Sequence, residues 1–211
     1  MSTPVKISIA MVVVVALGLG TLLFLGRGDD APAGGDGASA PYVREDSPRL
    51  TKGDKATFVE FLDFECEACL AAHPTIKELR STYGEDVTFV VRYLPLHGNS
   101  MNAAVAADAA RMQGKFEEMH DKLFESATEW GHQQTSQAKV FEGYAEEIGL
   151  DMEQYRKDIA DPKTTARVEQ SAEDAKTLGV QGTPTFFLDG EKLEAGTPDD
   201  LRKALDDAVK D

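Results

Sequence analysis

Cysteine is scarce in this 211-residue sequence: Cys66 and Cys69 are the only two copies, and they stand three positions apart. Two cysteines cannot build the disulfide network that holds many small secreted domains together, and a chain of this length can fold on its own core. A structural zinc site would need a second pair of ligands, which the four histidines do not supply at the required spacing. His73 could join the two cysteines around a metal, but no fourth ligand is evident. We therefore predict neither a metal centre nor a cofactor.

Positively charged side chains are also in the minority, with 22 lysines and arginines against 37 aspartates and glutamates. The formal net charge is −15, and the hydrophobic share of 42% is that of a globular protein. An acidic surface keeps a protein soluble and repels phosphate backbones. We therefore predict that nucleic acid is not a partner.

Long apolar segments are absent apart from residues 7–25, which carry no charge. As a helix these 19 residues would extend about 28 Å, which matches the hydrocarbon thickness of a bilayer. A signal peptide has a shorter apolar region, of about 7–15 residues, and the nearest small-x-small site contains a proline. We therefore predict an uncleaved anchor over residues 1–27, in preference to a cleaved signal peptide or a buried core helix. Lys6 and Arg27 nearly balance across the run, but the short N-terminal tail favours an N-terminus in the cytoplasm.

Residues 28–49 are rich in glycine, alanine, proline and aspartate and have no hydrophobic periodicity, which predicts a flexible linker. About 20 residues of this kind span roughly 25 Å, enough to hold a domain clear of the membrane surface. The folded domain is predicted over residues 50–211.

A βαβ unit is predicted at the start of this domain. Residues 56–64 (ATFVEFLDF) and 87–94 (VTFVVRYL) are rich in β-branched and aromatic residues, which predicts strands. Residues 67–83 between them predict a helix that ends at Gly84 and contains Pro74. Strands joined by a helix at this spacing are parallel.

The rest of the chain predicts a helical insertion and a return to the sheet. Residues 100–179 carry only helical signals. Residues 185–188 (TFFL) predict a strand, Asp189-Gly190 a hairpin turn and residues 191–194 the returning strand, followed by a final helix. The predicted fold class is therefore α/β, with a helical subdomain inserted between the two halves of one sheet.

The two cysteines lie where the first predicted strand meets its helix. Backbone N–H groups at a helix N-terminus stabilise negative charge, which favours the thiolate form of Cys66. Cys69 lies one turn further along, close enough to form a disulfide and better sheltered. The alternatives are buried apolar cysteines or a structural disulfide, but a loop this small would stabilise the fold little. The spacing therefore predicts a redox-active pair.

Three segments together resemble the DsbA-like thioredoxin-fold oxidoreductases, and among these the membrane-anchored members that work outside the cytoplasm. The segments are VEFLDFECEACLAAHPTIKELRSTYGEDVTFVVRYLPLH, QGKFEEMHDKLFE and LGVQGTPTFFLDG. The resemblance covers roughly residues 56–211 and implies a thioredoxin fold with an inserted helical subdomain. The fold predicted from the hydrophobic patterns agrees with it.

The resemblance also implies a role for each site residue. Cys66 attacks substrate disulfides or thiols, and Cys69 resolves the mixed disulfide. Pro184 is cis and shapes the substrate groove, although an X-Pro pair before a strand is by itself an ordinary turn. Thr183 offers backbone hydrogen bonds to an extended substrate peptide. Glu60 matches a buried acid that relays the proton of the second thiol; the alternative is a strand carboxylate satisfied by a structural partner.

By resemblance the chain is an enzyme, a protein thiol–disulfide oxidoreductase held in the cell membrane by one helix, with its catalytic domain outside the cytoplasm. We expect an oxidase that forms disulfides in exported proteins and is reoxidised by a quinone-linked membrane partner. The alternative is a reductase or isomerase that receives electrons across the membrane. A catalytically silent binding module is a third interpretation, which the intact cysteines and Thr-Pro pair disfavour.

The sequence departs from the family pattern around Cys66. The dipeptide between the cysteines is Glu67-Ala68, where strongly oxidising members often carry Pro-His, and Ala68 supplies no cation. Asp63, Glu65 and Glu67 add negative charge, and we expect them to be exposed and of little individual effect. An oxidant weaker than the strongest family members is therefore predicted.

Three further residues allow two interpretations each. His73 and His97 lie near the cysteines in sequence and could pack locally or take part in catalysis. Trp130, in the predicted helical insertion, is expected to be a packing residue rather than a substrate contact.

Overall fold

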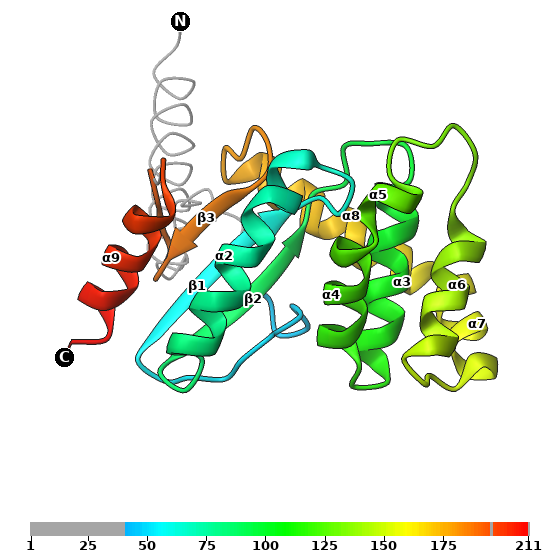
Figure 1. Cartoon of the computed structure of the whole chain (residues 1–211), viewed down its shortest axis with the longest axis horizontal. Coiled ribbons are helices and arrows are strands. Elements are labelled where there is room, and N and C mark those ends of the chain that lie inside the picture. The colour runs from blue at the N-terminus through cyan, green and yellow to red at the C-terminus, as the bar shows by residue number, and fades with distance from the viewer. Residues whose placement is uncertain (1–40, 195, 211) are drawn as a thin grey trace, which may run out of the picture. The chain divides into compact units, whose positions relative to one another are not determined.

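The computed structural model describes residues 41–194 and 196–210 (Figure 1). The predicted membrane anchor, residues 1–27, and residues 28–40 of the predicted linker lie outside the described residues. Within the two described ranges, no helix has both the length and the apolar character needed to cross a bilayer. The anchor and its orientation therefore stay predictions.

The strands of the described residues form one mixed sheet in the order β2-β1-β3-β4 (Figure 1). β1 (Ala56–Leu62) pairs in parallel with β2 (Val87–Tyr93) and antiparallel with β3 (Thr185–Leu188). β3 continues through a hairpin into β4 (Glu191–Lys192). α2 (Glu67–Tyr83) is the crossover that permits the parallel pairing, so the predicted βαβ unit is confirmed. Because β1 is a central strand, the residues that follow it lie between its neighbouring strands, at the end of the sheet where β1 finishes.

Helices cover both faces of the sheet because residues along β1 alternate in direction. Phe58 packs in a cluster with side chains of α2 and α9 (Pro198–Ala208). Val59 belongs to a second cluster, which includes side chains of α8 (Pro162–Thr177). The result is the layered arrangement of a thioredoxin fold, as predicted.

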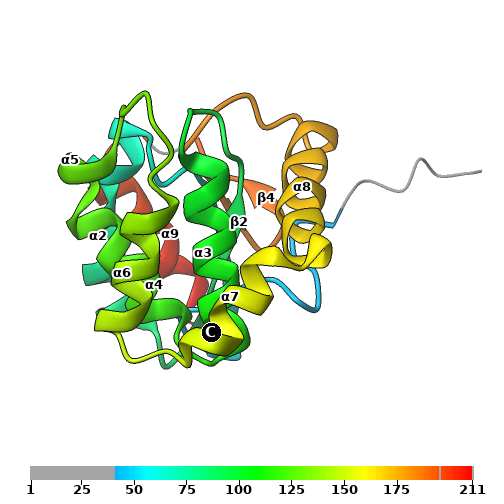
Figure 2. The same ribbon diagram turned by 90° about the vertical axis from the view of Figure 1, so that its right-hand side faces the viewer.

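The segment between β2 and β3 is helical, as predicted for residues 100–179. In chain order its helices are α3 (Ser100–Met112), α4 (Phe116–Glu125), α5 (Ala127–Trp130), α6 (Ala138–Glu147), α7 (Met152–Ala160) and α8. α3 contacts α4, α6, α7 and α8, and Figure 2 shows it among its neighbours. Most buried positions of α3 are alanines, whose small side chains let neighbouring helices approach closely.

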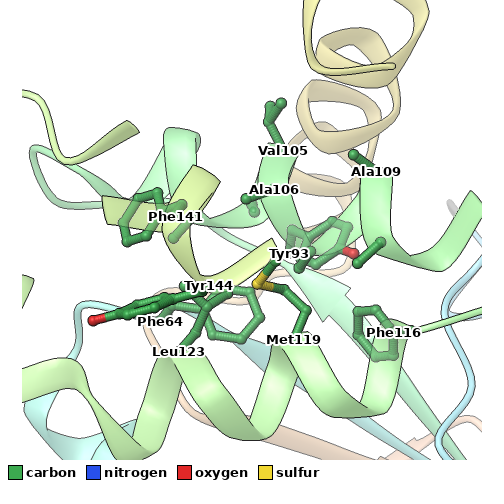
Figure 3. Packing of buried hydrophobic residues seen from close by; sticks show 14 of the residues in the cluster. Phe64, Tyr93, Val105, Ala106, Ala109, Phe116, Met119, Leu123, Phe141 and Tyr144 are labelled. Atoms are coloured by element: carbon green, nitrogen blue, oxygen red, sulfur yellow. The ribbon is translucent and has the colours of Figure 1, made fainter. Parts of the chain in front are cut away.

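A large apolar cluster joins the first helices of the insertion to the ends of β1 and β2. Phe64, which follows β1, and Tyr93, at the end of β2, gather with Met119 and Leu123 of α4 (Figure 3). Burying a side chain of this size contributes roughly 1.5–3 kcal/mol. The insertion therefore shares its core with the sheet, which fixes its loops relative to the ends of β1 and β2.

Near the end of the chain, the predicted hairpin turn and the predicted start of the final helix are both confirmed. Asp189 and Gly190 both have positive φ values, of 48° and 86°, as a tight hairpin turn requires. Thr197 opens α9 through a capping box, in which the Asp200 carboxylate accepts the Thr197 backbone N–H and the Thr197 hydroxyl accepts the Asp200 N–H.

Residues 41–49 belong to the predicted linker, but in the structure they lie against the domain. Arg44 donates two hydrogen bonds to Asp174 on α8, of 2.5 and 2.7 Å. Arg92 of β2 donates to two backbone carbonyls of this segment, at 2.9 Å each. Contacts with the domain therefore begin before the predicted boundary, because two arginines and an aspartate distant in sequence hold the segment in place.

Candidate active site

Cys66 is the N-cap residue of α2, directly after the loop that leaves β1. Its backbone is extended (φ −78°, ψ 123°), and its carbonyl accepts the N–H of Leu70 as the helix begins. Cys66 is half-buried, Cys69 is fully buried one turn further on, and both are free thiols. The unpaired N–H groups of the first helical turn favour negative charge at this end of α2, where the accessible thiol lies.

The loop before β3 lies against the accessible thiol. The Thr183–Pro184 peptide bond is cis, as predicted, and the Cys66 thiol donates to the Thr183 carbonyl oxygen at 3.4 Å. The two residues are 117 positions apart and meet because β3 pairs beside β1. The backbone of Thr183 therefore stands next to the sulfur, where an extended peptide could pair with it.

Cys69 and Glu60 form the buried part of the site. Glu60 lies on β1 and is 4% exposed, and burial raises its pKa to about 8. Burial also raises the pKa of the Cys69 thiol, and the nearby charge of Glu60 acts in the same direction. Both groups therefore hold their protons at neutral pH, and Cys69 becomes a nucleophile only when a base accepts its proton.

Asp63 joins the loop after β1 to the loop after β2. We expected Asp63 and Glu65 to be exposed, and this prediction is wrong: they are 1% and 5% exposed. One Asp63 oxygen accepts the N–H of Glu65 and the other accepts the N–H of Leu96, both at 2.8 Å. Hydrogen bonds from backbone N–H groups compensate a carboxylate for its lost water, which explains how this charge can be buried.

Glu65 connects the same loop to the helical insertion. Its Oε2 accepts the N–H of Asn99, and its Oε1 accepts the N–H of His132, both at 2.7 Å. The Asn99 side chain accepts the N–H of Gln137 and donates to two carbonyls of the loop between α5 and α6. A buried carboxylate next to Cys66 therefore fixes a loop that lies more than 60 residues further along the chain.

Two histidines lie at the exposed rim of the site. Nδ1 of His97 is 2.7 Å from Oδ2 of Asp63, and this hydrogen bond raises the pKa of His97. Nε2 of His132 is 3.1 Å from Oε1 of Glu67, the first residue between the cysteines. The imidazole rings meet edge to face, with their centroids 5.8 Å apart. Of the three acids around Cys66, only Glu67 is exposed.

His73 packs against α4 instead of reaching the rim. His73, His120 and Asp121 bring their ligand atoms within 4.8 Å of one another, a spacing that a metal ion could use. Asp121, however, is already paired with Arg80 at 3.0 Å and with Lys77 at 3.1 Å, and two cations oppose the binding of a third. We interpret this cluster as a packing contact between α2 and α4.

Sequence patterns missed part of the site for physical reasons. His132 and Glu65 are brought together by the tertiary fold, and no local pattern indicates such a pairing. Asp63 directly follows β1, where every residue from Phe58 to Leu62 is buried, and the same run of burial continues through Asp63. Trp130 is fully buried, as expected of a packing residue.

A family model described as Thioredoxin matches residues 52–207. The chain belongs to the thioredoxin family. The match includes the whole sheet, both cysteines, the helical insertion and almost all of α9. The thioredoxin fold predicted from the sequence is thereby confirmed.

Solved structures of thioredoxin-family proteins are similar over most of the chain. The thioredoxin-like oxidoreductase from Silicibacter pomeroyi DSS-3 is 32% identical, with a TM-score of 0.67 over 82% of this chain and 98% of that chain. The thiol-disulfide exchange protein alpha-DsbA2 from Wolbachia pipientis is 25% identical, with a TM-score of 0.66 over 76% and 86% of the two chains. BdbD from Bacillus subtilis, at 22% identity and a TM-score of 0.69 over 79% and 94%, shows the fold alone. The first two similarities confirm the DsbA-like resemblance and the predicted enzyme class, thiol–disulfide oxidoreductase.

Curated relatives match over a shorter stretch. The Na(+)/H(+) antiporter NhaA of Herminiimonas arsenicoxydans is 38% identical over 137 residues, which is 65% of this chain and 21% of that protein. The Na(+)/H(+) antiporter NhaA 3 of Salinispora tropica is 40% identical over 139 residues, 64% of this chain and 20% of that protein. The chain therefore spans about a fifth of the length of these relatives.

Proposed function

We propose that this protein is a membrane-tethered oxidase that works outside the cytoplasm and introduces disulfides into exported proteins. The observation that carries the proposal is the placement of the two thiols. Cys66 is accessible at a helix N-terminus and touches the Thr183 carbonyl, while Cys69 is buried behind it. This is the asymmetry that an attacking and a resolving cysteine require.

In the proposed reaction the oxidised pair accepts two electrons from a substrate dithiol. A substrate thiolate attacks Cys66 Sγ, which breaks the Cys66–Cys69 bond and forms a mixed disulfide. Cys69 leaves as a thiolate and takes up a proton, which Glu60 can supply because it is protonated at neutral pH. The second substrate thiolate then attacks the substrate sulfur of the mixed disulfide. The products are the substrate disulfide and the reduced pair, with Cys66 released as a thiolate.

Substrate binding in this scheme uses the backbone beside the thiol. An extended peptide can pair with Thr183, and the cis bond of Pro184 directs the Thr183 carbonyl toward Cys66. Recognition through the backbone does not depend on side chains, which suits an enzyme that acts on many unfolded exported proteins.

The location rests on the sequence. Residues 7–25 are long and apolar enough to span a bilayer, and disulfides persist in oxidising compartments. A quinone-linked membrane protein would restore the disulfide by accepting the two electrons.

The direction of electron flow can be tested by the reduction potential. A stabilised Cys66 thiolate favours the reduced form and makes the pair more oxidising. We expect a potential roughly between −120 and −270 mV, measured by equilibration with glutathione, acid quench and alkylation. A potential at or below about −270 mV would favour the alternative, a reductase or isomerase.

The separate roles of Cys66 and Cys69 can be tested by the mixed disulfides that their serine variants form. Cys69→Ser should accumulate mixed disulfides with disulfide-bonded substrate proteins, because Cys66 attacks the substrate disulfide, one substrate thiol leaves, and no Cys69 thiol remains to resolve the product. Cys66→Ser, the matched control, should form none. Accumulation in Cys66→Ser instead would reverse the two roles.

A further inference from the structure

The active site lacks a cation within the cysteine motif, but the fold brings one in from elsewhere. Glu67 and Ala68 stand between the cysteines, and the Glu67 side chain is 76% exposed. Its carboxylate pairs with Nε2 of His132 at 3.1 Å. His132 belongs to the loop between α5 and α6, so the helical insertion supplies this charge to the thioredoxin fold.

The position of His132 is fixed independently of its side chain. The backbone N–H of His132 donates to the buried Oε1 of Glu65 at 2.7 Å. Its φ value is 57°, in the left-handed region that residues other than glycine rarely adopt. A backbone held in this way keeps the imidazole beside Glu67 without the help of the ion pair.

The other charged groups that face His132 come from two neighbouring loops. Glu65 lies in the loop after β1, Glu67 is the first residue of α2, and the His97 ring meets the His132 ring edge to face. His97 is in turn paired with Asp63, so its own charge is largely offset. Glu67 is the exposed acid of this group and lies next to Cys66 in the chain, so the charge of His132 acts mainly on Glu67.

We propose that His132 is a positioning residue of the redox centre, whose protonated imidazole offsets Glu67 and thereby favours the Cys66 thiolate. The inference rests on the proposed thiol–disulfide exchange and deepens it. The thiolate of Cys66 belongs to the reduced pair, so a cation nearby stabilises the reduced form and makes the disulfide a stronger oxidant. An imidazole can contribute in this way only in its charged form, so the test compares two pH values.

The experiment compares full-length wild type with His132→Asn by equilibration against glutathione at about pH 6 and about pH 8.5, on either side of the ordinary histidine range. Asparagine tolerates the left-handed backbone, so the loop is retained. At the lower pH we expect the equilibrium constant for oxidation of glutathione to fall threefold or more in the variant. At the higher pH the two proteins should agree.

Two further variants separate charge from structure. His132→Lys carries a permanent cation, so its equilibrium constant should match or exceed that of wild type at both pH values. Lys139→Gln removes an exposed cation from α6 in the same subdomain and should behave like wild type.

The outcomes distinguish this inference from the proposed function. A wild-type protein that exchanges no disulfide with glutathione would overturn the proposed function itself. A redox-active wild type matched by His132→Asn at both pH values would overturn only the role of His132. An equal loss at both pH values, not restored by lysine, would identify a structural effect of the loop and would also overturn the role of charge.

Discussion

Glu60 and Cys69 place two protonated groups in the dry interior directly behind an accessible thiol. The energetic cost of this burial falls on the charged forms, which is why the pKa values of both groups are raised. The charge of Glu60 raises the pKa of the Cys69 thiol, so the two groups are electrostatically coupled. The titration of Glu60 also links the chemistry of the site to the stability of the fold.

Replacing Glu60 with glutamine should stabilise the reduced protein in alkali. Folded Glu60 keeps its proton up to about pH 8, whereas in the unfolded chain it titrates near 4.5. The folded state therefore binds more protons between these values, and its stability falls as the pH rises through this window. Glu60→Gln removes that loss. Its free energy of unfolding should therefore rise relative to that of wild type by a few kcal/mol between about pH 5 and about pH 9, at roughly 1.4 kcal/mol per pKa unit.

Urea denaturation of both reduced proteins at the two pH values measures the difference. Mixed-disulfide formation by Glu60→Gln should also slow by about tenfold or more at neutral pH, because the leaving Cys69 thiolate loses its proton donor. Parallel stability curves would show that Glu60 is not a buried titrating group.

At the scale of elements, the contact between α2 and α4 depends on two neutral imidazoles. His73 stacks on Phe124 with ring centroids 4.8 Å apart, and His120 packs edge to face against the same ring. The nitrogens of His73 and Nε2 of His120 are buried and have no hydrogen-bond partner among the described residues. Protonation of either ring would place a charge in this contact.

Acid should therefore loosen this contact. Burial lowers the pKa of His73 to about 4, from an ordinary value of 6.5. The folded state binds fewer protons than the unfolded state in this window, so the stabilisation is complete above about pH 6.5 and is lost as the pH falls toward 4. His73→Phe keeps the stacking on Phe124. Between about pH 7 and about pH 4.5 its free energy of unfolding should fall by about 2–3 kcal/mol less than that of wild type.

Thermal unfolding at both pH values provides the measurement for this element. Lys139→Gln is the matched control, because it removes an exposed charge outside the α2–α4 contact and should keep the acid response of wild type. An unchanged acid response in His73→Phe would assign the loss of stability to other groups.

Elements were predictable from the sequence where a local pattern specifies them. The strand at Ala56–Leu62, the helix that begins after Cys66 and the turn at Asp189-Gly190 all follow from hydrophobic period or backbone preference. The burial of Glu65 and its bond to His132 could not be predicted, because both depend on how a distant loop docks. Composition therefore indicated an exposed acidic rim where the structure has hydrogen-bonded, buried carboxylates.

At the scale of the whole molecule, one buried ion network fastens the segment before β1 to the domain. Asp174 of α8 pairs with Arg92 of β2 and with Arg44 of the N-terminal segment. The side chains of Asp174 and Arg92 are 3% and 2% exposed. Each of these buried charges has lost its hydration and is stabilised only by its oppositely charged partner, so removing one of them destabilises the others.

Asp174→Asn should therefore destabilise the protein by about 3–5 kcal/mol, since it leaves two arginines without their carboxylate. Glu153→Gln is a suitable control: it breaks an exposed pair with Lys157 on α7 and should change stability by less than about 1 kcal/mol. Chemical denaturation measures both variants, and limited proteolysis should cut within residues 41–49 faster in the Asp174→Asn protein than in wild type. Equal stability of the two variants would mean that the network is dispensable.

The fully buried Trp130 has an optical consequence. It is the only tryptophan of the chain, it packs edge to face on Phe141, and its indole N–H donates to the Leu123 carbonyl. Intrinsic fluorescence excited at the tryptophan band therefore reports on the helical insertion, whereas far-ultraviolet circular dichroism averages over every helix and strand. Because the insertion shares its core with the sheet, the two signals should change together during unfolding, and a separation between them would reveal that the insertion loosens while the sheet persists.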